Sequence, residues 1–82
     1  MEERPSGFYG LTAREMYIMG LLQQGLSYEA IALEGRITLG TVKQHVHHIL
    51  KKTSSPNKTV AINLWREWMK DQDAFYKKNP HP

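Results

Sequence analysis

Apolar residues recur along this chain at the spacing of helices, and residues that start or stop helices separate the apolar stretches. Thr12 and Glu15 form a capping box, in which each side chain accepts a hydrogen bond from the other residue's backbone amide. The first helix is expected to end just before Gly25, which provides a left-handed cap. Ser27 caps a second, short helix, and residues 35–37 break it.

Two longer helices follow in the second half of the chain. Thr38 caps the third, expected over residues 39–53, and residues 54–57 supply a break and a new cap. The fourth helix is expected from about Lys58 to residues 71–76. Nothing in the pattern indicates a strand, so the predicted fold is all-α with four helices. The short second helix, the break and the longer third helix have the lengths of a helix-turn-helix, with the third as recognition helix.

The length of the chain limits it to one small domain. With 82 residues, we expect a helical domain over residues 11–76 and flexible tails over residues 1–10 and 77–82. The chain has no cysteine, which excludes disulfides and thiolate metal sites. No secretory signal is visible, and the apolar runs are far shorter than the roughly 20 residues that span a bilayer. We therefore expect a cytoplasmic protein with no membrane partner.

Charge is unevenly distributed along the chain. The net charge is +3, but residues 35–66 hold six basic side chains and no acidic one, whereas residues 1–34 sum to −3. A basic block of this kind favours a polyanionic partner. A solvated basic surface is the alternative that charge alone leaves open.

The predicted third helix has one apolar and one polar side. At 100° per residue, Val42, Val46 and Ile49 fall on one stripe, which we expect to be buried. The opposite side bears hydrogen-bond donors and no acid: Gly40, Lys43, Gln44, His47, His48 and Lys51. Such side chains can bond base edges in the major groove of DNA, or its phosphates. The pattern is typical of a recognition helix, and an ordinary solvated helix face is the alternative.

Three histidines lie close together in this helix and raise the question of a metal site. His45 and His48 are three residues apart rather than four, and no Asp, Glu or Cys is near them in the sequence. We therefore expect no metal and no cofactor. His47 and His48 gain charge as the pH falls through about 6.5, so DNA affinity is expected to rise there. An enzyme is not expected, because no carboxylate pair, nucleophile–base set or phosphate loop is present.

Short motifs occur in a fixed order along the chain: Leu11-Thr12-Ala13-Arg14-Glu15, Gln24-Gly25-Leu26-Ser27, Ile31-Ala32, Gly40-Thr41-Val42-Lys43-x-His45, Ile49-x-Lys51-Lys52 and Asn57-Lys58-Thr59-x-Ala61. In this order and spacing they resemble the LuxR/GerE-type helix-turn-helix domain, over residues 11–66. Region 4 of sigma factors is a close structural relative of that domain, but His45 and residues 57–59 point away from it.

The resemblance implies a four-helix DNA-binding domain of a transcription regulator, without a cofactor. The third helix of this family enters the major groove, so the residues implied to face base edges are Lys43, Gln44 and His47. The residues implied to contact phosphates are Thr38, Thr41, His48, Lys51, Lys52 and Lys58. The resemblance also implies a bacterial or phage-encoded protein that is associated with the nucleoid when bound to DNA.

The chain departs from the family pattern at three places. Ala30 stands where the family usually has Glu, which removes the usual partner of Arg14. Gly35-Arg36 replaces Leu-Gly between the second and third helices, so a turn of different shape is expected. Residues 53–55, Thr-Ser-Ser, replace Leu-Gly-Val and remove apolar volume from the expected core.

The fourth helix carries more apolar surface than one small core requires. Its apolar residues, through Phe75 and Tyr76, spread over about 200°, whereas a helix packed on one core needs little more than about 100°. We expect the surplus to form a dimer or partner surface: Val60, Leu64, Trp65, Trp68 and Met69. A homodimer is the simplest arrangement, since it pairs two recognition helices on a two-fold site. The alternative is a tail that folds back and covers the surplus.

Together these features predict sequence-specific binding of double-stranded DNA by a small transcriptional regulator that acts as a homodimer. Ten residues precede Leu11, so no receiver or ligand-binding domain is expected within this chain. A stand-alone regulator is expected, and a fragment cut from a longer protein is the alternative. The alternative is a protein-interaction adaptor that binds another regulator or an RNA polymerase subunit through the fourth helix.

Overall fold

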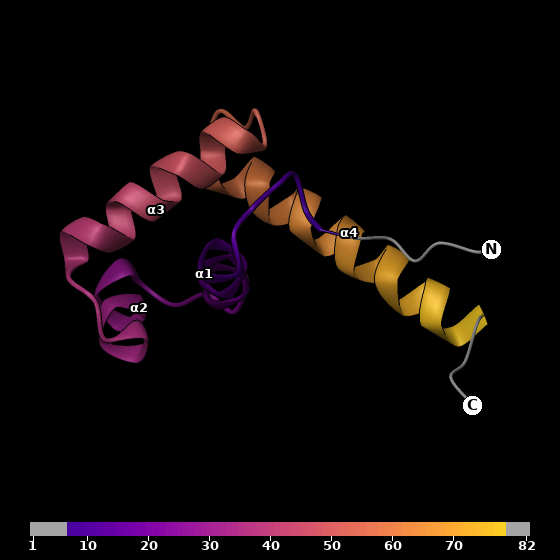
Figure 1. The fold of residues 1–82 in the computed structure, drawn as a ribbon, viewed down its shortest axis with the longest axis horizontal. Helices are drawn as coiled ribbons and strands as arrows, with labels where there is room; N and C mark the ends of the chain where they lie inside the picture. The colour runs from indigo at the N-terminus through magenta and orange to yellow at the C-terminus, as the bar shows by residue number, and fades with distance from the viewer. Residues whose placement is uncertain (1–6, 79–82) are drawn as a thin grey trace.

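The computed structural model describes residues 7–78, with side chains for residues 7–73. Four helices make up the fold: α1 (Ala13–Gln23), α2 (Tyr28–Gly35), α3 (Leu39–Lys52) and α4 (Lys58–Lys78). The described residues contain no strand, and the predicted all-α fold is confirmed. Figure 1 shows α3 and α4 diverging from a shared corner, with α1 seen end-on between them and α2 below α3.

Side-chain caps place the start of every helix at the predicted residue. Thr12 Oγ1 accepts from the Glu15 amide at 3.1 Å, and Glu15 Oε1 accepts from the Thr12 amide at 2.9 Å. The other three caps accept in the same way at 3.0–3.1 Å: Ser27 from Ala30, Thr38 from Thr41 and Asn57 from Val60. These bonds satisfy first-turn amides that have no partner within their own helix. Gly25 has a φ of 90°, as expected of a left-handed cap.

The core lies around α1, which contacts each of the other three helices. α3 contributes the predicted stripe of Val42, Val46 and Ile49, and all three are buried. The other buried apolar residues come from the N-terminal segment, α1, α2 and α4: Phe8, Leu11, Ile18, Met19, Leu22, Ile31, Ala61 and Trp65. Because one stripe of α3 faces this core, the opposite side of the helix faces solvent.

The N-terminal segment, residues 7–10, packs against the core, contrary to the expectation of a flexible tail there. Residues 1–6 of the expected N-terminal tail and residues 79–82 of the expected C-terminal tail lie outside the described residues. Phe8 is 1% exposed, and its ring centroid lies 5.2 Å from that of Trp65 and 5.6 Å from that of Trp68. The Leu11 amide donates to the Phe8 carbonyl at 2.9 Å, which closes a turn. Burying an aromatic ring against two tryptophans removes apolar surface from water, and this offsets the entropy cost of ordering the segment.

The fourth helix extends further than predicted. α4 ends at Lys78, so residues 77 and 78 are helical rather than part of the expected tail. In Figure 1 the C-terminal half of α4 continues away from the other helices. The predicted apolar positions Phe75 and Tyr76 have side chains outside the described residues.

The segment after α3 fills its part of the core with polar side chains. Thr53 and Ser55 are buried, and their hydroxyl oxygens lie 2.7 Å apart in a hydrogen bond. Thr53 Oγ1 also donates to the Ile49 carbonyl at 2.8 Å, so the expected loss of apolar volume is accompanied by satisfied hydrogen bonds. Ser54 has a φ of 53° and Arg36 one of 55°. Both left-handed positions thus hold a residue with a Cβ, which strains the backbone.

Candidate nucleic-acid interface

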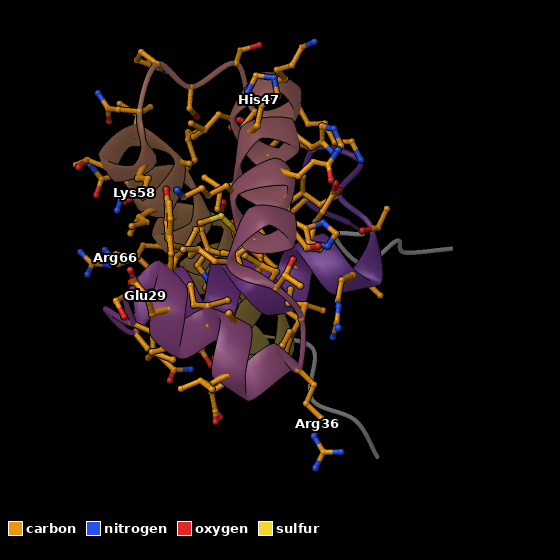
Figure 2. The ribbon with its side chains drawn as sticks, turned by 90° about the vertical axis from the view of Figure 1, so that its left-hand side faces the viewer. Glu29, Arg36, His47, Lys58 and Arg66 are labelled. Atoms are coloured by element: carbon orange, nitrogen blue, oxygen red, sulfur yellow. The ribbon has the colours of Figure 1, made fainter. Side chains whose placement is uncertain are left out.

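The turn between α2 and α3 sets how the polar side of α3 is presented. Arg36 adopts its left-handed conformation here, and the Ile37 amide donates to the Ala32 carbonyl at 3.0 Å. Arg14 lacks its usual acidic partner, as expected, but it donates instead to the Gly35 carbonyl at 2.9 Å. This bond ties α1 to the end of α2. Figure 2 shows the Arg36 side chain extending from the turn into solvent.

The solvent side of α3 carries the three residues predicted to face base edges. Lys43, Gln44 and His47 are all exposed, and no residue of α3 is acidic. Lys43 and His47 are four residues apart and therefore lie on one face of the helix. Figure 2 shows His47 near the end of α3 that is far from the turn. The arrangement presents hydrogen-bond donors along a helix that the major groove can accommodate.

Two threonines mark the start of α3. Thr38 is exposed and Thr41 is half-buried, and their hydroxyl oxygens lie 2.9 Å apart in a hydrogen bond. Thr38 also caps the helix through the Thr41 amide. Hydroxyls beside the positive end of a helix dipole suit a phosphate oxygen, which is the role predicted for both residues.

The predicted phosphate contacts at the other end of α3 differ in their surroundings. Lys51 is exposed, and the ion pairs among the described residues do not include it. Lys52 Nζ lies 2.7 Å from Glu15 Oε1 and donates to the Gly10 carbonyl at 3.4 Å. His48 Nδ1 lies 3.9 Å from Glu15 Oε2. An acid is thus close to this histidine in space, although none is close in sequence.

Glu15 is the buried acid of this cluster, with 4% of its surface exposed. Burial by itself raises the pKa of Glu15, but the Lys52 ammonium and the hydrogen bonds of Thr12 hold that pKa below its ordinary value. The carboxylate is therefore charged at neutral pH and paired with Lys52. The sequence identified Glu15 as a cap. It contains no signal for the second role, because Lys52 is 37 positions away.

Lys58, the last of the predicted phosphate contacts, lies at the start of α4. Its ammonium is 4.7 Å from the centroid of the Tyr28 ring, a cation–π contact that joins α4 to α2. Burial raises the pKa of the Tyr28 hydroxyl, so the ring stays neutral at physiological pH. Lys58 itself is exposed. Figure 2 shows Lys58 and Arg66 on the side of the molecule where α2 presents Glu29.

The exposed apolar surface of α4 is smaller than the sequence predicted. Trp65 is 7% exposed and belongs to the core, so its assignment to a partner surface is wrong. Val60, Leu64 and Trp68 are half-buried, and Leu64 and Trp68 pack against the core. Phe8 covers part of the surplus, as in the alternative of a folded-back tail.

Met69 is the most exposed of the five residues assigned to that surface, at 47%. It borders an open surface cavity of about 370 Å³, lined by Gln23, Arg66, Met69, Lys70 and Asp73. This cavity lies between α1 and α4, on a part of the chain that the DNA-binding prediction does not use.

Two other kinds of partner, a metal ion and a membrane, can be compared with the described residues. Within residues 7–73, no three His, Cys, Asp or Glu side chains come together in a way that could hold a metal ion. No helix in the described part of the chain is long and apolar enough to cross a bilayer.

Fold and surface together define a class of protein. It is a four-helix domain in which α2 and α3 form a helix-turn-helix, and α3 presents a side with hydrogen-bond donors and no acid. Residues 10–65 match the family described as "Bacterial regulatory proteins, luxR family". The chain belongs to this family, which confirms the resemblance to the LuxR/GerE-type helix-turn-helix domain, a DNA-binding domain. The family is one of regulators and not of enzymes.

Similar proteins are longer regulators. The chain is 41% identical over 59 residues to the "Monoamine regulon transcriptional regulator" of Klebsiella aerogenes, covering 72% of this chain and 25% of that protein. It is 40% identical over 62 residues to the "Response regulator protein VraR" of Staphylococcus saprophyticus, covering 76% and 30%. The solved structure of the response regulator ChrA in a heme-sensing two-component system superposes with a TM-score of 0.69 at 38% identity, covering 80% and 32%. The chain thus spans between a quarter and a third of these relatives.

Proposed function

We propose that this chain binds double-stranded DNA in a sequence-specific way, with α3 in the major groove. The exposed side of α3 carries the proposal, because it offers donors from Lys43, Gln44 and His47 and no acid. A well-aligned lysine or glutamine contact discriminates between bases by about 1–3 kcal/mol. Family membership and the names of the similar regulators support this reading.

The phosphate contacts in this proposal surround the base-reading residues. They come from both ends of α3 and from the start of α4: Thr38, Thr41, His48, Lys51 and Lys58. Lys52 was expected among them, but its ion pair with Glu15 makes it less available. Imidazole side chains gain positive charge as the pH falls, so DNA affinity is expected to rise between pH 8 and pH 6.

The biological role that fits this binding is that of a small transcriptional regulator. Such a protein acts in the cytoplasm of a bacterium, from a bacterial or phage gene, and is associated with the nucleoid while it is bound to DNA. We further propose that it acts as a homodimer through α4, on which Met69 is exposed and Val60, Leu64 and Trp68 are half-buried. A dimer presents two recognition helices to a two-fold site.

Selection of bound DNA from a random duplex library tests the proposed function. An enriched inverted repeat is expected, and Lys43→Ala with His47→Ala should abolish the enrichment while the far-UV circular dichroism stays unchanged. Glu67→Ala is the control, because this residue is 72% exposed on α4 and lies about 200° around the helix from Met69. An unchanged pool from the folded wild-type chain contradicts the proposal.

Sedimentation tests the dimer separately. Met69→Glu places a charge on an exposed position that contributes nothing to the core, so the mass should fall from dimer to monomer without loss of folding. Trp68→Glu is less clean, because Trp68 packs against Phe8. The same mass for Met69→Glu and wild type would mean that this side of α4 is not a dimer interface.

A second candidate is an adaptor that binds another regulator or RNA polymerase. The observation in its favour is Met69 at the rim of the cavity between α1 and α4, flanked by the basic residues Arg66 and Lys70. An adaptor should keep its partner when Lys43 and His47 are both replaced by alanine, whereas a DNA-dependent regulator should lose its activity.

A further inference from the structure

Two adjacent lysines end α3, and they lie in different environments. Lys51 is exposed, with its ammonium outside the ion pairs of the described residues. Lys52 Nζ lies 2.7 Å from Glu15 Oε1 and 3.4 Å from the Gly10 carbonyl oxygen. In the sequence the two lysines are equivalent cations, but in the fold only Lys52 is held in an ion pair.

The partner of Lys52 is a carboxylate that cannot easily release it. Glu15 is 4% exposed, and its Oε1 atom also accepts the Thr12 amide at 2.9 Å. Removing the cation from a buried carboxylate leaves an uncompensated charge in a medium of low polarity, which is strongly unfavourable. A DNA phosphate at the surface is well hydrated and offers Lys52 less than it would lose.

The pair also connects α3 to α1. Glu15 belongs to the first turn of α1 and caps that helix, while Lys52 is the last residue of α3. The ion pair and the bond to Gly10 therefore join the end of α3 to the start of α1 and to the N-terminal segment. Together with the bond from Arg14 to the Gly35 carbonyl, this pair connects α1 to the end of α2 and to the end of α3.

We propose that Glu15 is a positioning residue for DNA binding: it holds Lys52 in an intramolecular ion pair, away from the DNA backbone, while Lys51 makes the phosphate contact. This inference rests on the proposed DNA binding. Its consequence is a lower sequence-independent affinity, because each lysine that binds a phosphate strengthens binding to every DNA sequence alike. Specific binding through Lys43, Gln44 and His47 then stands out more clearly from the background.

The salt dependence of binding to a duplex of arbitrary sequence tests the proposal. Each phosphate that a lysine neutralises contributes a slope of about −0.9 in log affinity against log salt concentration. All titrations are made at the same pH, so that the variants differ only in the substituted side chain. Fluorescence anisotropy of a labelled duplex provides the affinities, and circular dichroism shows that each variant is folded.

Four variants separate the two lysines. Lys51→Met should reduce the steepness by about 0.9 per bound subunit, whereas Lys52→Met should leave the slope unchanged and lower thermal stability. Glu15→Gln should make the slope steeper by about 0.9, because Lys52 is released toward the DNA. Adding Lys52→Met to Glu15→Gln should restore the wild-type slope. A purely structural role for Glu15 does not produce a steeper slope.

Several outcomes overturn the proposal. It is wrong if Lys52→Met flattens the slope as much as Lys51→Met does, or if folded Glu15→Gln keeps the wild-type slope. If Glu15→Gln or Lys52→Met does not fold, Lys52→Gln and the conservative Lys52→Arg decide, since both should keep the wild-type slope and only the arginine should keep the stability. Failure of the wild-type chain to bind any duplex overturns the proposed function itself, and this inference with it.

Discussion

At the scale of single residues, Arg36 and Ser54 occupy backbone positions that favour glycine. Their φ values are 55° and 53°, in the left-handed region where a Cβ costs about 1–2 kcal/mol. Each ends a helix, α2 in one case and α3 in the other. The family pattern has glycine at both positions, so the sequence alone marked them as unusual, and the structure keeps the turns at the expense of strain.

Ser54→Gly is therefore expected to stabilise the domain. Relief of backbone strain outweighs the larger entropy of glycine in the unfolded chain, so the free energy of unfolding should rise by about 0.5–1 kcal/mol. Urea denaturation followed by circular dichroism measures the change. Ser55→Gly is the control, because it removes a buried hydroxyl bonded to Thr53, and it should destabilise. Equal or lower stability for Ser54→Gly contradicts the strain argument.

The buried hydroxyl pair of Thr53 and Ser55 should behave as a unit. Thr53→Val keeps the shape of the side chain but leaves Ser55 without its partner, and should cost about 1–2 kcal/mol of unfolding free energy. Adding Ser55→Ala removes the unsatisfied group, so the double variant should be more stable than Thr53→Val. Denaturation of the two singles and the double gives the coupling energy, and strictly additive effects would show that the pair is not coupled.

At the scale of elements, the caps and the apolar stripes depend on residues close together in the sequence, whereas the hydrogen bonds and ion pairs between helices join residues far apart. Each cap joins residues three positions apart, and the buried stripe of α3 follows the period of the helix. The bond from Arg14 to Gly35 spans 21 positions and that from Lys52 to Glu15 spans 37. Periodicity carries no information about such pairs, because they depend on how α1 crosses the ends of α2 and α3.

The ion pair between Glu15 of α1 and Lys52 of α3 should make the stability of the fold depend on pH. The pKa of Glu15 in the folded chain lies below its ordinary value of 4.5, so the carboxylate contributes stability above that value. This contribution is lost as the pH falls through the folded pKa. Between about pH 5 and pH 3, the unfolding free energy of the wild type should therefore fall more steeply than that of Glu15→Gln.

The control for this measurement is Glu67→Gln on α4. Glu67 is 72% exposed and lies 4.0 Å from Lys70, a surface pair that contributes little. Its pH profile should run parallel to that of the wild type. Parallel profiles for Glu15→Gln and the wild type would show that the ion pair with Lys52 does not stabilise the fold.

At the scale of the whole molecule, the N-terminal segment is the element that sequence reasoning placed wrongly. Phe8 closes the core over Trp65 and Trp68, and this reduces the apolar surface left on α4 for a partner. The apolar width of α4 therefore has two explanations, an additional core contact and the remaining exposed side near Met69. The structure of a single chain shows only the core contact, in which Phe8 packs against Trp65 and Trp68.

Phe8→Ala tests how much the N-terminal segment contributes to the stability of the fold. Loss of a fully buried phenylalanine should lower the unfolding free energy by about 3–4 kcal/mol and change the fluorescence of the tryptophans. Tyr9→Ala is the neighbouring control, since Tyr9 is 53% exposed and should cost less than about 1 kcal/mol. Wild-type stability for Phe8→Ala would show that the segment does not contribute to the core.

The four helices, their caps and the donor-rich side of α3 follow from the sequence alone, because they depend on interactions within one turn and on a repeating period. It also carried the family motifs, and with them the domain class. Three features arise only when the helices pack together: Phe8 is in the core, Arg14 donates to the Gly35 carbonyl, and Lys52 rather than Lys51 is held in an ion pair. Those outcomes depend on helices far apart in the chain meeting in space, where burial forces a charged or aromatic group to find a partner.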